Sequence, residues 1–158
     1  MRAIRILSSA IFATVLLAQP AMAQNKAAMT KLSGEFYKVS LGLSNSLADL
    51  TKRIGTASPN DRDMLKLVTS QLGIVNASAE GVLDLGALAG EVRDAGDMAI
   101  VKKHLISRCA NFKSSAEATA KYMESVTANI AAVATAAEVT KARELLTQMS
   151  QHPLCAVK

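Results

Sequence analysis

Tryptophan is absent from this chain, and aromatic residues make up only 3% of it. Once residues 1–23 are set aside, four aromatic rings remain, on Phe36, Tyr37, Phe112 and Tyr122. Proteins that bind single-stranded nucleic acid stack bases on exposed rings that alternate with Lys and Arg. The chain lacks the residues for such a surface, so we expect no nucleic-acid partner.

Residues with metal-binding and catalytic chemistry are also scarce. The chain has two cysteines and two histidines, without H-E-x-x-H, a paired C-x-x-C, or the C-x-x-C-H of covalent haem attachment. G-x-S-x-G and the phosphate loop G-x-x-x-x-G-K-[ST] are missing as well. The sequence therefore predicts a non-enzymatic protein without a metal ion or a cofactor.

Long apolar runs are confined to the N-terminus. Arg2 and Arg5 precede the apolar run 6–17, and the small-x-small pattern of signal peptidase follows at 21–23. These features predict a signal peptide over residues 1–23, cleaved after Ala23, and export of the mature protein to a bacterial periplasm. No later stretch has eighteen uninterrupted apolar residues, so we expect no membrane span after cleavage.

Residues 24–158 are enough for one domain with its own core. Loss of Arg2 and Arg5 leaves 16 basic residues against 13 acidic ones, so the mature chain has a net charge of about +3. The basicity of the full sequence therefore overstates that of the mature protein.

The longest amphipathic pattern runs from Asp97 to about Val133. Its apolar positions recur every three or four residues, which places them on one face of a helix: Met98, Val101, Leu105, Cys109, Phe112, Ala116, Thr119, Met123, Val126, Ile130 and Val133. At about 1.5 Å per residue this helix is too long to stand alone in a small domain. We expect an all-α, up-and-down antiparallel bundle of about four long helices.

The other helices are predicted from the same spacing and from end signals. The first mature helix covers about 26–54, and the second begins at Ser58 and Pro59, an N-cap followed by a first-turn proline. Its pattern loosens where three glycines occur, so a kink or split is expected near Gly81–Gly90. A capping box at 135–138 predicts that the last helix starts near Ala136 and ends at His152.

The two cysteines are predicted to form a disulfide. With the last turn near Ala134, Cys109 lies 25 residues before the turn and Cys155 lies 21 residues after it. Helical rise, with an extended tail after Pro153, gives these two arms similar lengths. In an oxidising compartment we therefore expect a structural bond between Cys109 and Cys155.

The surface expected to bind a partner lies where the second helix meets the third. The last helix is too short to cover the whole of the third, which leaves this end with fewer neighbours. The candidate residues are Leu85, Leu88, Val92, Met98, Val101, Lys102 and Lys103. The motif Gly86-x-x-x-Gly90 within this region favours close helix packing, with a binding surface as the alternative.

Two functional classes follow from these observations. The first is an exported envelope protein that acts through protein–protein contacts or self-association, such as a chaperone-like, immunity or assembly factor. The alternative is a small periplasmic haem or metal/redox carrier of the four-helix-bundle type, which would use Met and His side chains as ligands.

Overall fold

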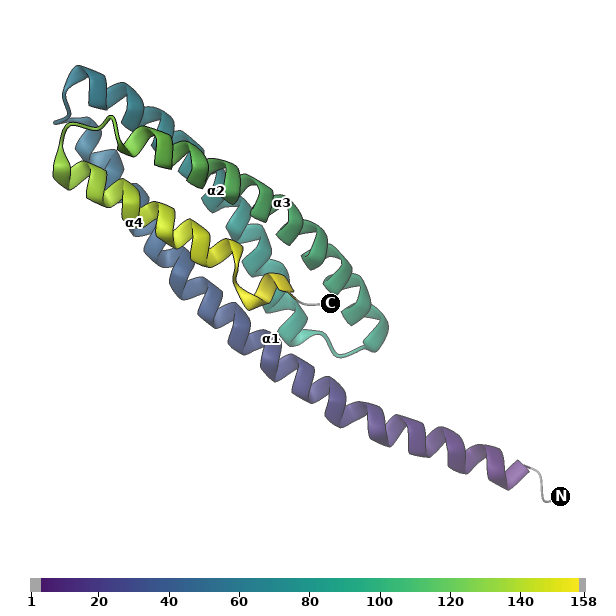
Figure 1. Ribbon diagram of the computed structural model, residues 1–158. Coiled ribbons are helices and arrows are strands. Elements are labelled where there is room, and N and C mark those ends of the chain that lie inside the picture. Colours follow the sequence, from purple (N-terminus) through teal and green to yellow (C-terminus); the bar gives the residue numbers. More distant parts are fainter. Residues whose placement is uncertain (1–3, 157–158) are drawn as a thin grey trace.

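The computed structural model describes the backbone of residues 4–156 and the side chains of residues 24–156. Four α-helices and one short 3₁₀ helix follow one another: α1 Ile4–Ile54, α2 Pro59–Glu91, α3 Ala95–Thr127, α4 Val133–Ser150 and η1 Pro153–Ala156. The helices lie alongside one another with short connections, and α1 continues past the other three at its N-terminal end (Figure 1). The described chain is the predicted all-α, up-and-down bundle. The proposed signal segment 1–23 lies outside the residues whose side chains are described.

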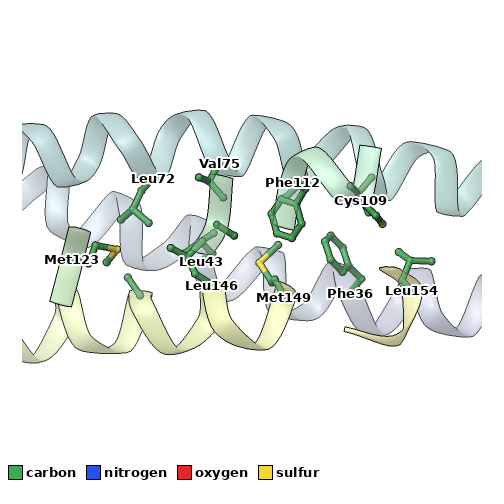
Figure 2. Packing of buried hydrophobic residues seen from close by; sticks show 14 of the residues in the cluster. Phe36, Leu43, Leu72, Val75, Cys109, Phe112, Met123, Leu146, Met149 and Leu154 are labelled. Carbon is green, nitrogen blue, oxygen red and sulfur yellow. The ribbon is translucent and has the colours of Figure 1, made fainter. Parts of the chain in front are cut away.

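The core forms where the apolar stripes of the four helices meet. Large side chains from each helix are fully buried there, and Figure 2 shows several of them directed into the space between the helices. Phe36 of α1 and Phe112 of α3 meet edge to face, with ring centroids 5.8 Å apart. Such a pair contributes beyond its buried area, on the order of 1 kcal/mol.

The start of α2 follows the sequence prediction. Ser58 is the N-cap, its Oγ accepts a hydrogen bond from the Asp61 backbone N–H at 3.2 Å, and Pro59 occupies the first turn. The Asp61 side chain is buried, and its Oδ1 accepts a hydrogen bond from the Ala131 backbone N–H at 3.2 Å. Asp61 therefore ties the beginning of α2 to the turn between α3 and α4.

The predicted kink or split near Gly81–Gly90 is wrong. Helix α2 is continuous from Pro59 to Glu91, and the bend lies instead in the last helical segment. A Cβ atom added at Gly86 would lie 2.6 Å from Ser33 Oγ, and one added at Gly90 would lie 2.5 Å from Thr30 Oγ1. These glycines therefore allow α1 and α2 to approach each other closely, which is the packing role that the G-x-x-x-G spacing favours.

The helix boundaries around the last turn also differ from the prediction. Helix α3 ends at Thr127, and Ile130 is buried in the turn that follows. Helix α4 begins at Val133 after Ala132, which makes no side-chain cap hydrogen bond, so the expected capping box at 135–138 is not formed. Thr135 is instead a buried residue within the helix.

Candidate functional site

The C-terminal segment closes the bundle where α4 ends. The Sγ atoms of Cys109 and Cys155 lie 2.04 Å apart and their Cα atoms 5.3 Å apart, which confirms the predicted pairing. Leu154 is fully buried, with its two methyl groups 3.1 and 3.2 Å from the place where a Cβ on Gly86 would be. The 3₁₀ helix η1 thus packs against α1 and α3 and extends the cover that α4 provides.

His152 supports this closure from the junction between α4 and η1. Its ring packs edge to face on Phe36, with centroids 5.4 Å apart, and its Nδ1 accepts a hydrogen bond from the Leu154 backbone N–H at 3.2 Å. Partial burial lowers the pKa of His152, opposed in part by the nearby Glu35 carboxylate, which raises it. The neutral imidazole is therefore the form that holds the tail.

Beyond the closure, the bundle is continued by α1, α2 and α3. Helix α2 ends at Glu91, and Asp94 starts α3 as its N-cap by accepting hydrogen bonds from the Gly96 and Asp97 backbone N–H groups at 2.7 and 3.2 Å. Helix α3 therefore begins at Ala95, two residues before Asp97, where the amphipathic pattern of the sequence starts. The short connection makes the end of α2 and the start of α3 antiparallel neighbours (Figure 1).

The predicted surface residues divide into three groups at this end. Met98 and Val101 are buried in the core, and Leu85 and Val92 are half-buried against it. Leu88 is 46% exposed, Lys102 is half-buried and Lys103 is exposed. Three helices are therefore enough to cover the core here, and of the five apolar candidates only Leu88 presents a large surface to solvent.

One exposed apolar residue of this region was not among the predicted surface residues. Ile100, in the second turn of α3, is 57% exposed. Its position between Met98 and Val101, out of phase with the buried stripe, is the signal that could have identified it. Together Leu88 and Ile100 place two large apolar side chains on the outside of the same end of the bundle, and we call them, with half-buried Leu85 and Val92, the end patch.

Charges surround the end patch without being paired to one another across the two helices. Glu91 and Asp97 are exposed on the acidic side, and Lys102 and Lys103 follow on α3. Among the described residues, no ion pair within 4.0 Å joins the end of α2 to the start of α3. These charges are therefore available to a binding partner.

A groove of about 660 Å³ lies elsewhere, between α3 and α4. Ala116 and Ala120 contribute to its lining, and Arg143 Nη1 lies 3.5 Å from Glu124 Oε1. The Thr147 hydroxyl in this groove donates its hydrogen bond to the Arg143 backbone carbonyl at 3.1 Å. The groove is lined by a mixture of polar and apolar side chains, and the Ser150 hydroxyl in it likewise donates to a backbone carbonyl, that of Thr147, at 2.9 Å.

The side chains that a haem or metal carrier would use are placed mostly in the core. Met29, Met98, Met123 and Met149 are buried and Met64 is half-buried, while His104 is exposed. No group of three or more His, Cys, Asp or Glu residues that could hold a metal ion occurs among the described residues. The carrier hypothesis gains no supporting observation from this part of the chain.

One helix in the described part of the chain, α2, is long and apolar enough by composition to cross a membrane. The most apolar 18-residue window has a mean hydropathy of 1.3, and 33% of that window is buried inside the bundle. A core helix of a bundle passes the same test.

Comparison of the chain with protein-family models, curated proteins and solved structures gives no match.

Proposed function

We propose that this chain is an exported, non-enzymatic protein that acts by binding another protein through the end patch. The observation that carries the proposal is the exposure of Leu88 and Ile100 at an end of the bundle whose core is already closed. Neither side chain is needed to complete the core, and desolvation of exposed apolar side chains is a main source of binding free energy.

The surroundings of the end patch indicate the chemistry of the partner. Lys102 and Lys103 lie close in sequence to Ile100, so a partner segment with an apolar side chain next to an acidic one fits the α3 side. We expect the apolar contact to supply most of the affinity and the lysines to affect the association rate and its salt dependence.

Site-specific photocrosslinking tests the proposed contact. A photoreactive amino acid at position 88 or 100 should give an adduct with a protein partner in intact cells. The matched control is position 41, because Leu41 is also an exposed leucine (47%) but lies on α1. Equal adducts from positions 41, 88 and 100, or none from 88 and 100, would contradict the proposal.

Charge reversal provides a second readout. The Lys102→Glu/Lys103→Glu variant should lower the adduct yield from position 100 while leaving the helical circular dichroism spectrum unchanged. Lys121→Glu, also exposed on α3, is the control for a general effect of charge.

Export is tested independently of binding. The mature protein should begin at Gln24 when its N-terminus is sequenced, and it should appear in the periplasmic fraction with Cys109 and Cys155 oxidised. A full-length chain retained in the cytoplasm with free thiols would refute this part of the proposal.

A further inference from the structure

The outward face of α2 carries unusually few charges for a helix on the surface of a bundle. No charged residue occurs between Lys66 and Glu80, while Leu67 and Ile74 are 57% and 60% exposed. Since solvent-facing helix surfaces are normally charged or polar, an uncharged stretch with two large exposed apolar side chains indicates a contact surface.

Two glycines on this face have no packing role among residues 24–156, whose side chains the structure describes. A Cβ atom added at Gly73 or Gly81 would meet no atom within 4 Å, in contrast to Gly86 and Gly90. Glycine within a helix lowers its stability relative to alanine, so the fold itself does not favour these two residues. Exposed Ala77 lies midway between them at a spacing of four, so the three form one stripe on which another helix can approach closely.

The charges at the two ends of this face are complementary and symmetric. Arg62 and Lys66 lie before the uncharged stretch, at eleven and seven residues from Gly73, and Asp84 and Glu80 lie at the same distances after it. All four are exposed and share the helix face of Gly73 and Ala77. A helix with this arrangement is complementary to a second copy of itself in the antiparallel direction.

The contacts that these charged side chains make within the chain are all exposed to solvent, so they can easily be replaced by contacts with a second chain. Arg62 donates a hydrogen bond to the Ala57 carbonyl at 3.2 Å, and Lys66 Nζ lies 3.4 Å from Asp63 Oδ1. Glu80 accepts a hydrogen bond from Asn76 at 3.3 Å. Asp63 reduces the positive charge at the beginning of α2, which leaves one net positive charge there against two negative charges at the other end.

We propose that two copies of this chain associate through the outward faces of their α2 helices, antiparallel, about a two-fold axis close to Gly73. Lys66 of each copy then faces Glu80 of the other, and Arg62 faces Asp84 farther from the axis. The two copies of Ile74 flank the crossing point, and the glycines allow the helix backbones to come close. A two-fold axis makes each of these contacts twice, as in most homodimers.

The α2 interface is centred on Gly73, fifteen residues before Leu88, although Asp84 at its outer end lies one helical turn from Leu88 of the end patch. The end patch binds a different protein and is tested in cells at positions 88 and 100. The α2 interface is tested on purified mature chain alone, so failure of one is distinguishable from failure of the other.

Sedimentation equilibrium of the mature chain tests the interface directly. The wild type should be a dimer at micromolar concentrations, and Ile74→Asp should be a folded monomer because its side chain points away from the core. Lys66→Glu should weaken the dimer by at least about tenfold, because like charges then face each other. Lys66→Glu/Glu80→Lys should restore it, whereas Lys121→Glu on α3 should have no effect.

Oxidative crosslinking tests the position of the axis. Gly73→Cys should form a disulfide-linked dimer rapidly, because the same residue of both copies meets at a two-fold axis and the native cysteines are already paired. Ala48→Cys, exposed on α1, should remain monomeric under the same conditions.

Several results would overturn the proposal. One is a wild-type monomer up to hundreds of micromolar, and another is a dimer indifferent to the substitutions at positions 66, 73 and 74. A third is a monomer that binds vesicles of phosphatidylethanolamine and phosphatidylglycerol in a way that Ile74→Asp abolishes, since the uncharged face would then be a membrane contact.

Discussion

Removal of the disulfide should destabilise the bundle by a predictable amount. Cys109 and Cys155 are separated by 46 residues along the chain. In the chain-entropy account, a crosslink that closes a loop of this length restricts the unfolded chain by about 4 kcal/mol. For a domain of this size, a loss of this order lowers the melting temperature by roughly 12–16 °C. We therefore expect Cys109→Ala/Cys155→Ala to fold, but with much lower stability.

Urea unfolding followed by far-UV circular dichroism measures this change. Wild type treated with dithiothreitol should unfold at the same urea concentration as the double variant, because both lack the crosslink. The dependence of the unfolding free energy on urea should increase slightly, since an unfolded chain without the loop exposes more surface.

A packing control separates the crosslink from the side chains around it. Leu154→Ala keeps the disulfide but removes a fully buried side chain, and should cost about 2–5 kcal/mol. If the free energy of unfolding of the cysteine variant is lower than that of the wild type by less than about 1 kcal/mol, the tail must detach before the bundle unfolds. The calculation from loop length would then be refuted.

Three further predictions concern single positions. Gly86→Ala should destabilise the protein in thermal unfolding, because the new Cβ would collide with side chains of α1 and η1. At Gly81 a new Cβ meets no described atom within 4 Å, so Gly81→Ala should stabilise α2 by up to about 1 kcal/mol. Asp61→Ala leaves a backbone N–H of the last turn without its acceptor and should cost about 1–3 kcal/mol in urea unfolding, against almost nothing for exposed Asp63→Ala. Because the pKa of His152 is lowered in the folded protein, the unfolded chain binds a proton at this residue first as the pH falls. The contribution of neutral His152 to the free energy of unfolding is therefore complete above pH 6.5 and is lost as the pH falls below this value. His152→Gln should show a weaker fall in stability between pH 7.5 and 5.

The fold could be predicted from the sequence because its strongest signals are local. The spacing of apolar residues along α3 identified all nine residues that this helix buries, and Ser58 with Pro59 identified the start of α2. Apolar residues outside the stripes were harder to assign. Leu67 and Ile100 are exposed although their residue type favours burial, and only the position of the neighbouring helices determines this.

The disulfide was predicted correctly although two steps of the reasoning were wrong. The turn comes near Ile130 rather than Ala134, which shortens the arm that begins at Cys109 and lengthens the other. The tail from Pro153 is a 3₁₀ helix rather than an extended strand, which shortens the second arm again. These two differences compensate, so the sulfurs meet.

The role of the glycines in α2 could not be read from the sequence. Gly81, Gly86 and Gly90 all suggested a break in the helix, because glycine has a low helix propensity wherever it occurs. Gly86 and Gly90 face α1, whereas Gly81 faces open space, and this distinction depends on the packing of another helix. Tertiary contacts therefore decide the meaning of a glycine that local propensity treats as a stop signal.

Helix α4 is attached to the rest of the molecule at both of its ends. Before it, the Ala131 backbone is hydrogen-bonded to Asp61, and after it Cys155 is bonded covalently to Cys109. Once that bond has formed, α4 cannot leave its place to be exchanged for the α4 of another copy. The disulfide therefore prevents domain swapping of α4. If α4 contacts another protein, it does so through a surface that is already folded.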